Sequence, residues 1–269
     1  MSFILFLFLA HLGIGIAWTL LLVRREAGVK FFRFNAGLAA LLLVAAAALR
    51  PKPPDSTGID LVWGVGLWLL YATIAGLTLY WATIGRALAA LRPVFLWAAL
   101  LAGAGAILVH ALVMSWPSGS MVVRGLTAAS FVTSAALLGG ACTAMVLGHW
   151  YLILPSMEIG LLQRIVRFHL TSLIARVILV AGVVAAVAGG LMAAKIDLAH
   201  YATSAAGVFL WQRVLFGLAG PAVLGWLTWE TAKIRSTQSA TGILYVDFFT
   251  VIVGEVLAKY LLMETSLPL

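Results

Sequence analysis

The chain has 269 residues, of which 64% are hydrophobic and 10% are charged, and its formal net charge is +8. Together with a mean hydropathy of +1.11, this composition excludes a soluble globular domain, which carries about 25% charged residues. The apolar runs are much longer than the roughly 10 residues of a transmembrane barrel strand. We therefore expect an all-α integral membrane protein.

About eight transmembrane helices are predicted, because a spanning helix needs about 20 mostly apolar residues. The first has no basic residue before it and no small-residue cleavage site, which favours a membrane anchor over a secretory signal peptide. The predicted spans are Ser2–Val23, Phe34–Leu49, Leu61–Trp81, Val94–Met114, Leu126–Tyr151, Phe168–Ala193, Val208–Trp229 and Gly242–Met263.

The basic residues are unevenly divided between alternate connections, and this asymmetry predicts the orientation, since Lys and Arg near span ends resist translocation. The connections after spans one, three, five and seven hold Arg24, Arg25, Lys30, Arg33, Arg86, Arg92, Arg164, Arg167, Lys233 and Arg235. The other side has Arg50, Lys52, Arg124 and Lys195. We expect a multi-pass protein of the cell (inner) membrane with both termini outside. Topology and anionic lipids account for the positive charge, so no nucleic-acid partner is expected.

Two connections share a short pattern that hints at internal duplication. Glu26-Ala27-Gly28 leads to Arg33-Phe34, and Glu158-Ile159-Gly160 leads to Arg167-Phe168. We expect one polytopic domain, residues 1–269, with possible parallel four-helix halves at 1–124 and 125–269.

Several chemistries are disfavoured by missing motifs. The single cysteine, Cys142, lies within a span, and the chain has no CxxCH, GxxxxGK[ST], HExxH or CxxC pattern. We therefore expect no covalent c-type haem and no iron–sulfur cluster in this chain.

Five ionisable side chains fall inside the predicted spans, where a charge costs at least about 2.5–3.5 kcal/mol. They are Arg176, Arg213, Asp247, Glu255 and Lys259. Helical rise puts Asp247 and Arg176 at a similar depth, which predicts a neutralising pair. Glu255 and Lys259 share a helix face, and Arg213 lies at a compatible depth, which predicts a second cluster. Structural pairing and the lining of a quinone, proton or ion path are both open.

The histidines fall at two predicted levels. His149 ends span five and His169 begins span six, so both are expected near the cytoplasmic face, while His11 and His110 fall in the outer half. Two facing imidazoles can ligate the iron of a b-type haem, and His149 and His169 are the predicted metal ligands if haem is present. Tyr151 is a further candidate for binding a quinone or lipid headgroup. The alternative for each histidine is packing or hydrogen bonding at the membrane interface.

In span count and topology, without a shared motif, the chain looks similar to the quinone-reactive membrane anchors of polysulfide- and dimethyl-sulfoxide-reductase-type complexes. This resemblance implies an integral subunit of a respiratory-type electron-transfer complex that binds quinone or quinol, with b-type haem as a possible second cofactor. The chain would be at most the membrane subunit of an oxidoreductase, docked to other subunits and surrounded by lipid. The alternatives are a small transporter or channel with a polar path on the last helix, and a purely structural anchor.

Overall fold

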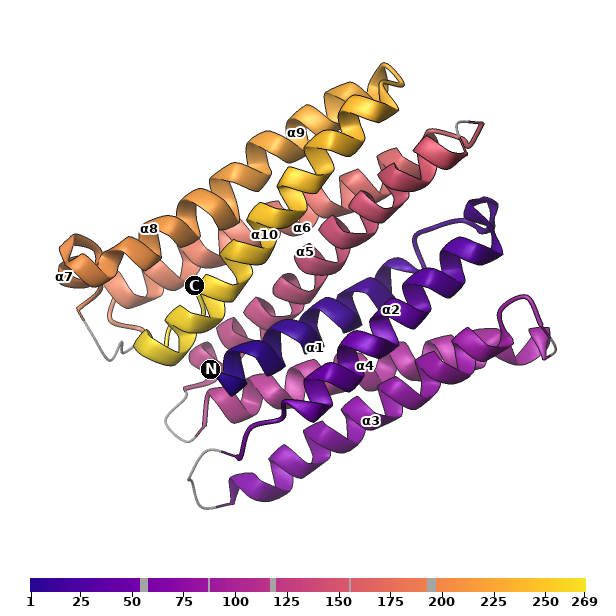
Figure 1. Ribbon diagram of the computed structural model, residues 1–269. Coiled ribbons are helices and arrows are strands. Elements are labelled where there is room, and N and C mark those ends of the chain that lie inside the picture. Colours follow the sequence, from indigo (N-terminus) through magenta and orange to yellow (C-terminus); the bar gives the residue numbers. More distant parts are fainter. Residues whose placement is uncertain (54–57, 87, 117–119, 155, 193–196) are drawn as a thin grey trace.

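The computed structural model describes residues 1–53, 58–86, 88–116, 120–154, 156–192 and 197–269, and these ranges contain helices and no strand (Figure 1). Eight helical segments are long and apolar enough to cross a membrane, which confirms the predicted all-α multi-pass fold. The helices are α1 (Ser2–Thr19), α2 (Gly28–Ala48), α3 (Ile59–Thr83), α4 (Arg92–Met114), α5 (Met121–Ile153), α6 (Gly160–Ala188), α7 (Leu198–Thr203), α8 (Val208–Val214), α9 (Gly220–Lys233) and α10 (Thr237–Thr265). Helices α8 and α9 join through a π-helical turn, Leu215–Ala219, into the seventh span.

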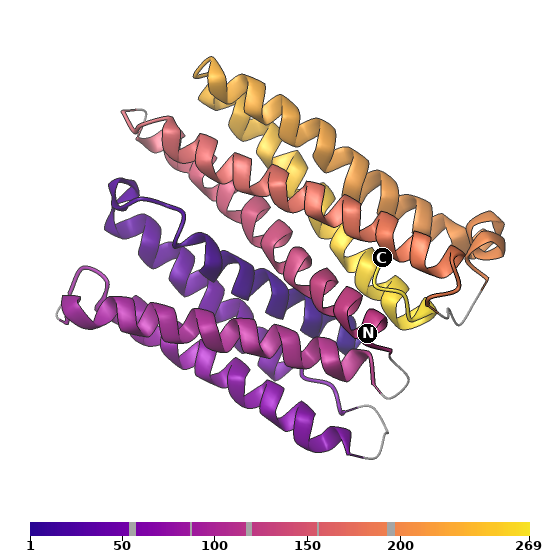
Figure 2. The same ribbon diagram turned by 180° about the vertical axis from the view of Figure 1, so that it is seen from behind.

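Both ends of the chain lie at one end of the bundle, which we call the terminal end (Figures 1 and 2). The opposite end, called the basic end, holds the connections α1–α2, α3–α4, α5–α6 and α9–α10. The ten basic residues of the odd-numbered connections lie in or beside these four segments. The helix order therefore gathers the positive charge at one end of the bundle.

Several helices begin earlier than predicted, α6 and α2 by the most, and this changes the depth of the polar residues. Helix α6 starts at Gly160 instead of Phe168, and α2 starts at Gly28 instead of Phe34. The extra turns carry arginines whose long side chains can reach the membrane interface while the backbone stays helical. Arg167, for example, lies over the ring of Trp229 at 5.4 Å. Residues in the middle of α6 consequently lie about 12 Å deeper than predicted, at 1.5 Å per residue.

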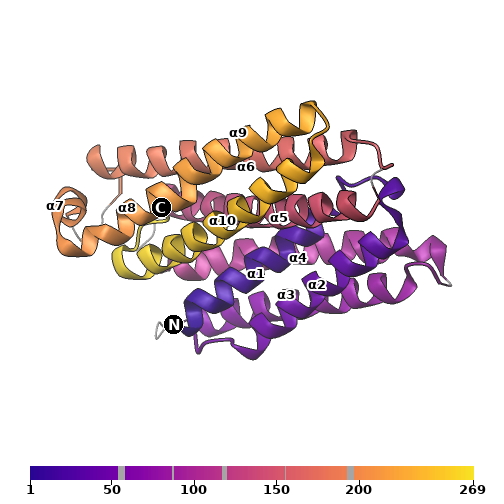
Figure 3. The ribbon, with the colours of Figure 1, turned by 45° about the horizontal axis from the view of Figure 1, so that its top comes forward.

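Helices α1 and α5 pack together in the middle of the bundle (Figure 3). A Cβ added to Gly15 would overlap the backbone of α5, and one added to Gly139 would overlap the backbone of α1. Thr19 Oγ1 and Thr143 Oγ1 are hydrogen-bonded at 2.6 Å, 124 residues apart in the chain. Small residues allow such close approach between helices in lipid.

The remaining spans surround this central contact in matching order. In the first half α1 contacts α2, α2 contacts α3 and α3 contacts α4; in the second, α5 contacts α6, α6 contacts α9 and α9 contacts α10. Equivalent helices of two parallel repeats meet in this way when a pseudo-twofold axis runs along the membrane normal. The division into halves at 1–124 and 125–269, and the duplication behind it, stay predictions.

Candidate functional site

Four ionisable side chains meet in the interior of the second half, between α6, α8 and α10. Glu255 Oε1 lies 3.1 Å from Arg176 Nε and 3.2 Å from Arg213 Nη2. Its Oε2 lies 3.3 Å from Lys259 Nζ. These side chains are between 0% and 4% exposed. We call these four residues the Glu255 cluster. The predicted grouping of Arg213, Glu255 and Lys259 is present, and Arg176 joins it.

The cluster brings three cationic side chains to one carboxylate, a formal excess of two positive charges among the four. Buried charges are tolerated only when they are paired and hydrogen-bonded. Arg176 meets this condition, since it also donates to Ser130 O at 3.0 Å. Arg213 does not: none of its guanidinium nitrogens makes a hydrogen bond with the residues described. The excess charge makes this part of the bundle suited to an anion or to a group that becomes negative.

The π-helical turn Leu215–Ala219 positions Arg213. Pro221 follows this turn, and a proline has no N–H to donate and clashes with the carbonyl four residues earlier, so the α-helical pattern is interrupted there. Gly217 in the turn lies against Gly254 of α10, and a Cβ on either glycine would overlap the other. This contact brings α8 close enough to α10 for Arg213 to reach Glu255.

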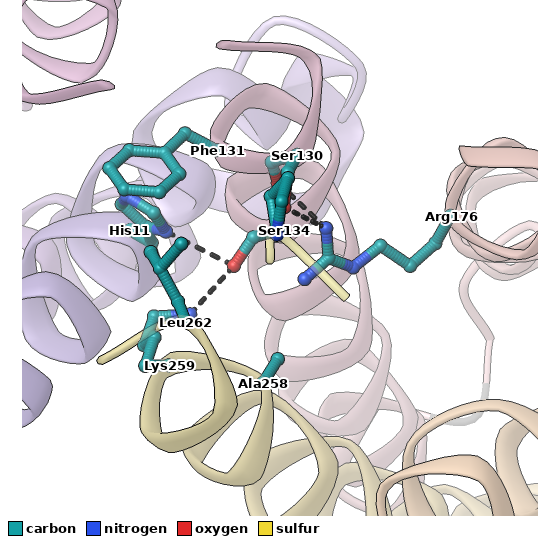
Figure 4. Close-up of a pocket in the computed structure, with 9 residues that line it drawn as sticks. His11, Ser130, Phe131, Ser134, Arg176, Ala258, Lys259 and Leu262 are labelled. Atoms are coloured by element: carbon teal, nitrogen blue, oxygen red, sulfur yellow. Dashed lines mark hydrogen bonds between the residues drawn. The ribbon is translucent and has the colours of Figure 1, made fainter. Parts of the chain in front are cut away.

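Ser134 connects the cluster to α1 (Figure 4). Its hydroxyl donates to Glu255 Oε2 at 2.5 Å and accepts from Lys259 Nζ at 2.8 Å. It also lies 3.1 Å from His11 Nδ1. Because a serine has one hydrogen and that hydrogen goes to Glu255, Nδ1 of His11 is the donor in this third bond. His11 Nε2 has no partner among the described residues.

A small cavity of about 10 Å³ lies beside this network and is lined by His11, Ser130, Ser134, Arg176 and Lys259, among others. That volume is close to the space that one water molecule occupies. Sequence reasoning missed both serines, since a serine in an apolar helix is usually bonded to its own backbone.

A second acid–base pair lies nearer the basic end. His169 Nε2 is 2.9 Å from Asp247 Oδ2, and both side chains are 0% exposed. These two atoms are not aligned as a hydrogen bond, and His169 Nδ1 and Asp247 Oδ1 also have no partner in the described part of the chain. The predicted Asp247–Arg176 pair is therefore wrong. Helix α6 starts eight residues earlier than predicted, so His169 takes the depth expected for Arg176.

His149 and His169 do not lie at similar depth, as a shared haem would need. A Cβ on Gly140 would lie 3.2 Å from His169 Cα, and His149 follows Gly140 by nine residues on α5. At 1.5 Å per residue the two histidines are about 13 Å apart along the helix axis. His149 is exposed, and its Nδ1 lies 3.1 Å from Tyr245 Oη.

The other two predicted binding residues have local packing roles. Tyr151 is 1% exposed, and its hydroxyl donates to Glu158 O and accepts from Leu162 N, so it braces the α5–α6 connection. His110 packs against the rings of Phe6 and Trp63 at centroid distances of 5.0 and 5.3 Å.

A larger cavity of about 630 Å³ lies at the terminal end between α6, α7 and α8. Its lining is mainly apolar and includes Val180, Val184, Met192, Leu210, Trp211 and Leu269. Leu269 also accepts a hydrogen bond from Arg176 Nη2 at 3.4 Å, and Pro268 lines the small cavity. The segment 268–269 thus borders both cavities. Arg176 and Lys259 of the Glu255 cluster line the small cavity, and Arg176 reaches the larger one through its bond to Leu269.

Comparison with known proteins gives no match: no protein family, no curated protein and no solved structure matches this chain.

Proposed function

We propose that this chain is the quinone-binding membrane subunit of an electron-transfer complex, with the quinone headgroup in the 630 Å³ cavity. The observation that carries the proposal is that Leu269, which lines this apolar cavity, accepts a hydrogen bond from Arg176 of the buried Glu255 cluster. Ligand sites of about 300–1,000 Å³ are typically apolar with a few polar groups that fix orientation.

The cavity suits a flat apolar ring with a polar edge. Val180 lies one turn beyond Arg176 on α6, and Val214 directly follows Arg213 on α8, so the inner wall borders the cluster. The bond from Arg176 Nη2 to Leu269 O is, at 3.4 Å, the longest that Arg176 makes. That N–H is the donor best placed to turn toward a quinone carbonyl.

The chemistry needs charge compensation as well as space. Reduction of a quinone to a quinol consumes two electrons and two protons, and negative charge develops on the quinone oxygens before protonation. The excess positive charge of the Glu255 cluster would stabilise that charge in a low-dielectric site. Lys259 and His11 carry protons on nitrogen that can be transferred and replaced, and Ser134 joins them.

The electrons would come from, or go to, redox centres in other subunits. The described connections between spans are short, so the chain needs docked partners for the rest of the electron path. The orientation we propose has the terminal end outside the cytoplasm and the basic end inside, following the positive-inside rule. A b-type haem remains a possible second cofactor, and the different depths of His149 and His169 do not support these two residues as its axial pair.

Quinone retention tests the proposal. Val184→Phe places a ring in the cavity, and Val177→Phe on the same helix is the control, since Val184 is 42% exposed, Val177 is 41% exposed and only Val184 lines the cavity. Quinone extracted per mole of purified protein should fall about tenfold with Val184→Phe, equivalent to about 1.4 kcal/mol, and stay unchanged with Val177→Phe. Equal retention in both variants, or none in the parent, would refute a quinone in this cavity.

The same samples test the haem. A reduced-minus-oxidised visible spectrum of the parent protein shows whether a b-type haem is present. If the spectrum carries haem bands, loss of those bands in His149→Gln and in His169→Gln would support these two histidines as the axial ligands. Bands that survive both changes would assign the haem to other side chains.

The alternative function is a small transporter or channel. The observation that favours it is the set of ionisable groups along α10, from Asp247 to Lys259, in the bundle interior. A transporter would retain no quinone and would carry an ion or solute across proteoliposomes.

A further inference from the structure

We propose that the bundle has two binding sites for anionic phospholipid at its basic end. One site lies at Arg33 and Trp81, between α2 and α3, and the other at Arg167 and Trp229, between α6 and α9. Each site takes the phosphate of one lipid. The inference goes beyond the proposed function and does not depend on it, because lipid headgroups surround a membrane protein whatever its activity.

The same arginine–tryptophan pair occurs twice, four spans apart. Arg33 Cζ lies 5.2 Å from the centre of the Trp81 ring, and Arg167 Cζ lies 5.4 Å from the centre of the Trp229 ring. The arginines are near the starts of the second and sixth spans, and the tryptophans are near the ends of the third and seventh. A single arginine over an aromatic ring is common. Its recurrence at corresponding positions indicates a shared ligand.

Both arginines have hydrogen-bond donors free for phosphate oxygens. Within the described ranges, neither Arg33 nor Arg167 donates to an oxygen or forms an ion pair with a carboxylate. A second cation, Lys30 or Arg164, precedes each arginine by three residues and shares its helix face. Arg164 has one long hydrogen bond, from Nη1 to Leu22 O at 3.5 Å. An indole ring offers no oxygen acceptor, so the planar N–H fork of each arginine is left for a phosphate.

The tryptophans set the level of the two sites in the membrane. Trp81 is two residues from the end of α3 and Trp229 is four residues from the end of α9, about 3 Å and about 6 Å along the helix axis. Tryptophan rings are enriched at the level of the lipid headgroups. The arginines start between one and two turns inside α2 and α6, and their long side chains can extend toward the interface. Guanidinium and ring therefore meet at the level of the phosphates.

Exposed apolar residues lead from each arginine toward the middle of the membrane. Leu41 and Val44 follow the arginine of α2 by eight and eleven residues and are 66% and 49% exposed. Ile174 and Ile178 follow the arginine of α6 by seven and eleven residues and are 58% and 67% exposed. These spacings keep each set on one helix face. A lipid covers both parts, with its phosphate at the arginine and its acyl chains along the face. An acidic protein at the membrane surface would leave the apolar face bare.

The charges at the two sites favour an anionic lipid over a zwitterionic one. Each site has two cations on one helix face, and the ammonium group of phosphatidylethanolamine would lie close to them. Phosphatidylglycerol brings its phosphate without a positive charge. Glu230, next to Trp229, is paired with Lys233 at 2.7 Å, so its carboxylate is neutralised locally. Helices α3 and α9 lie on opposite sides of the bundle, so the sites bind separate lipids (Figures 1 and 2).

Native mass spectrometry of the purified full chain counts the bound lipids directly. With phosphatidylglycerol added to the detergent micelles, the parent protein should retain two lipids. Arg33→Gln and Arg167→Gln should each retain one, and the double variant none. The occupancy of each site should fall at least about tenfold, since a hydrogen bond to a charged group is lost with its charge. Phosphatidylethanolamine should be retained less than phosphatidylglycerol by the parent protein.

Two controls separate phosphate recognition from general attraction. Arg24→Gln removes the same charge from an exposed residue at the same end and should keep both lipids. Arg33→Lys keeps the charge and loses the planar fork, so it should lose the first lipid without a change in net charge. Equal loss in Arg24→Gln, equal retention of the two lipid types, or displacement of the lipids by inorganic phosphate would overturn the proposal. Two lipids retained by the double variant would overturn it as well, and would leave the pairs to an acidic partner subunit.

Discussion

Replacement of Glu255 by glutamine is expected to destabilise the protein strongly. The Glu255 carboxylate is the one anionic group of the cluster. It faces the cationic groups of Arg176, Arg213 and Lys259, and all three are buried. Glutamine keeps the shape but raises the formal excess of positive charge from two to three. Removing one partner of a buried ion pair lowers the free energy of unfolding by about 3–5 kcal/mol. We therefore expect a loss of that size in the free energy of unfolding, more than a hundredfold in the folding equilibrium.

The control is the same substitution in an exposed ion pair. Glu230 Oε1 lies 2.7 Å from Lys233 Nζ, with the two side chains 44% and 47% exposed. Because solvent screens such a pair, Glu230→Gln should cost less than about 1 kcal/mol. Lys259→Met lowers the excess charge of the cluster from two to one, so it should cost less than Glu255→Gln.

Equilibrium unfolding in mixed micelles, followed by tryptophan fluorescence, measures all three variants. The reasoning fails if Glu255→Gln loses no more stability than Glu230→Gln. It fails equally if Lys259→Met proves more damaging than Glu255→Gln, since the cluster would then not be governed by its excess positive charge.

Two further predictions concern packing and orientation. Gly254→Ala should destabilise the protein by about 1–3 kcal/mol through overpacking, because the added Cβ would overlap Gly217. Gly182→Ala is the control, since a Cβ at Gly182 meets nothing within 4 Å. It should leave the free energy of unfolding unchanged or raise it in the same assay. Reporter fusions after Ser56 and Ser118 should report the side opposite the cytoplasm, as the basic asymmetry predicts; a cytoplasmic signal at both positions would reverse the proposed orientation.

Much of the fold could be predicted from the sequence, because hydropathy and span length are local properties of the chain. The apolar runs predicted eight spans, and the alternation of basic connections predicted that the ten basic residues gather at one end. The ionisable residues of the spans could also be found by inspection, since a charge in lipid stands out against its apolar neighbours. All five, Arg176, Arg213, Asp247, Glu255 and Lys259, are buried in the structure.

Partner assignment could not be predicted, because it depends on where each helix begins and how it is rotated. Hydropathy starts α6 at Phe168, since the arginines before it look like a connection. The helix actually includes them from Gly160, and Asp247 therefore meets His169 while Arg176 meets Glu255.

The roles of Ser130 and Ser134 and the two cavities could not be predicted from the sequence for a related reason. Ser134 has its role only because α1, α5 and α10 converge on one hydroxyl. The 630 Å³ cavity forms where α6, α7 and α8 meet, which depends on how these helices pack. The sequence by itself determined which groups must be kept away from lipid. The tertiary structure decided which of them share charge and protons, since that depends on contacts between helices distant in the chain.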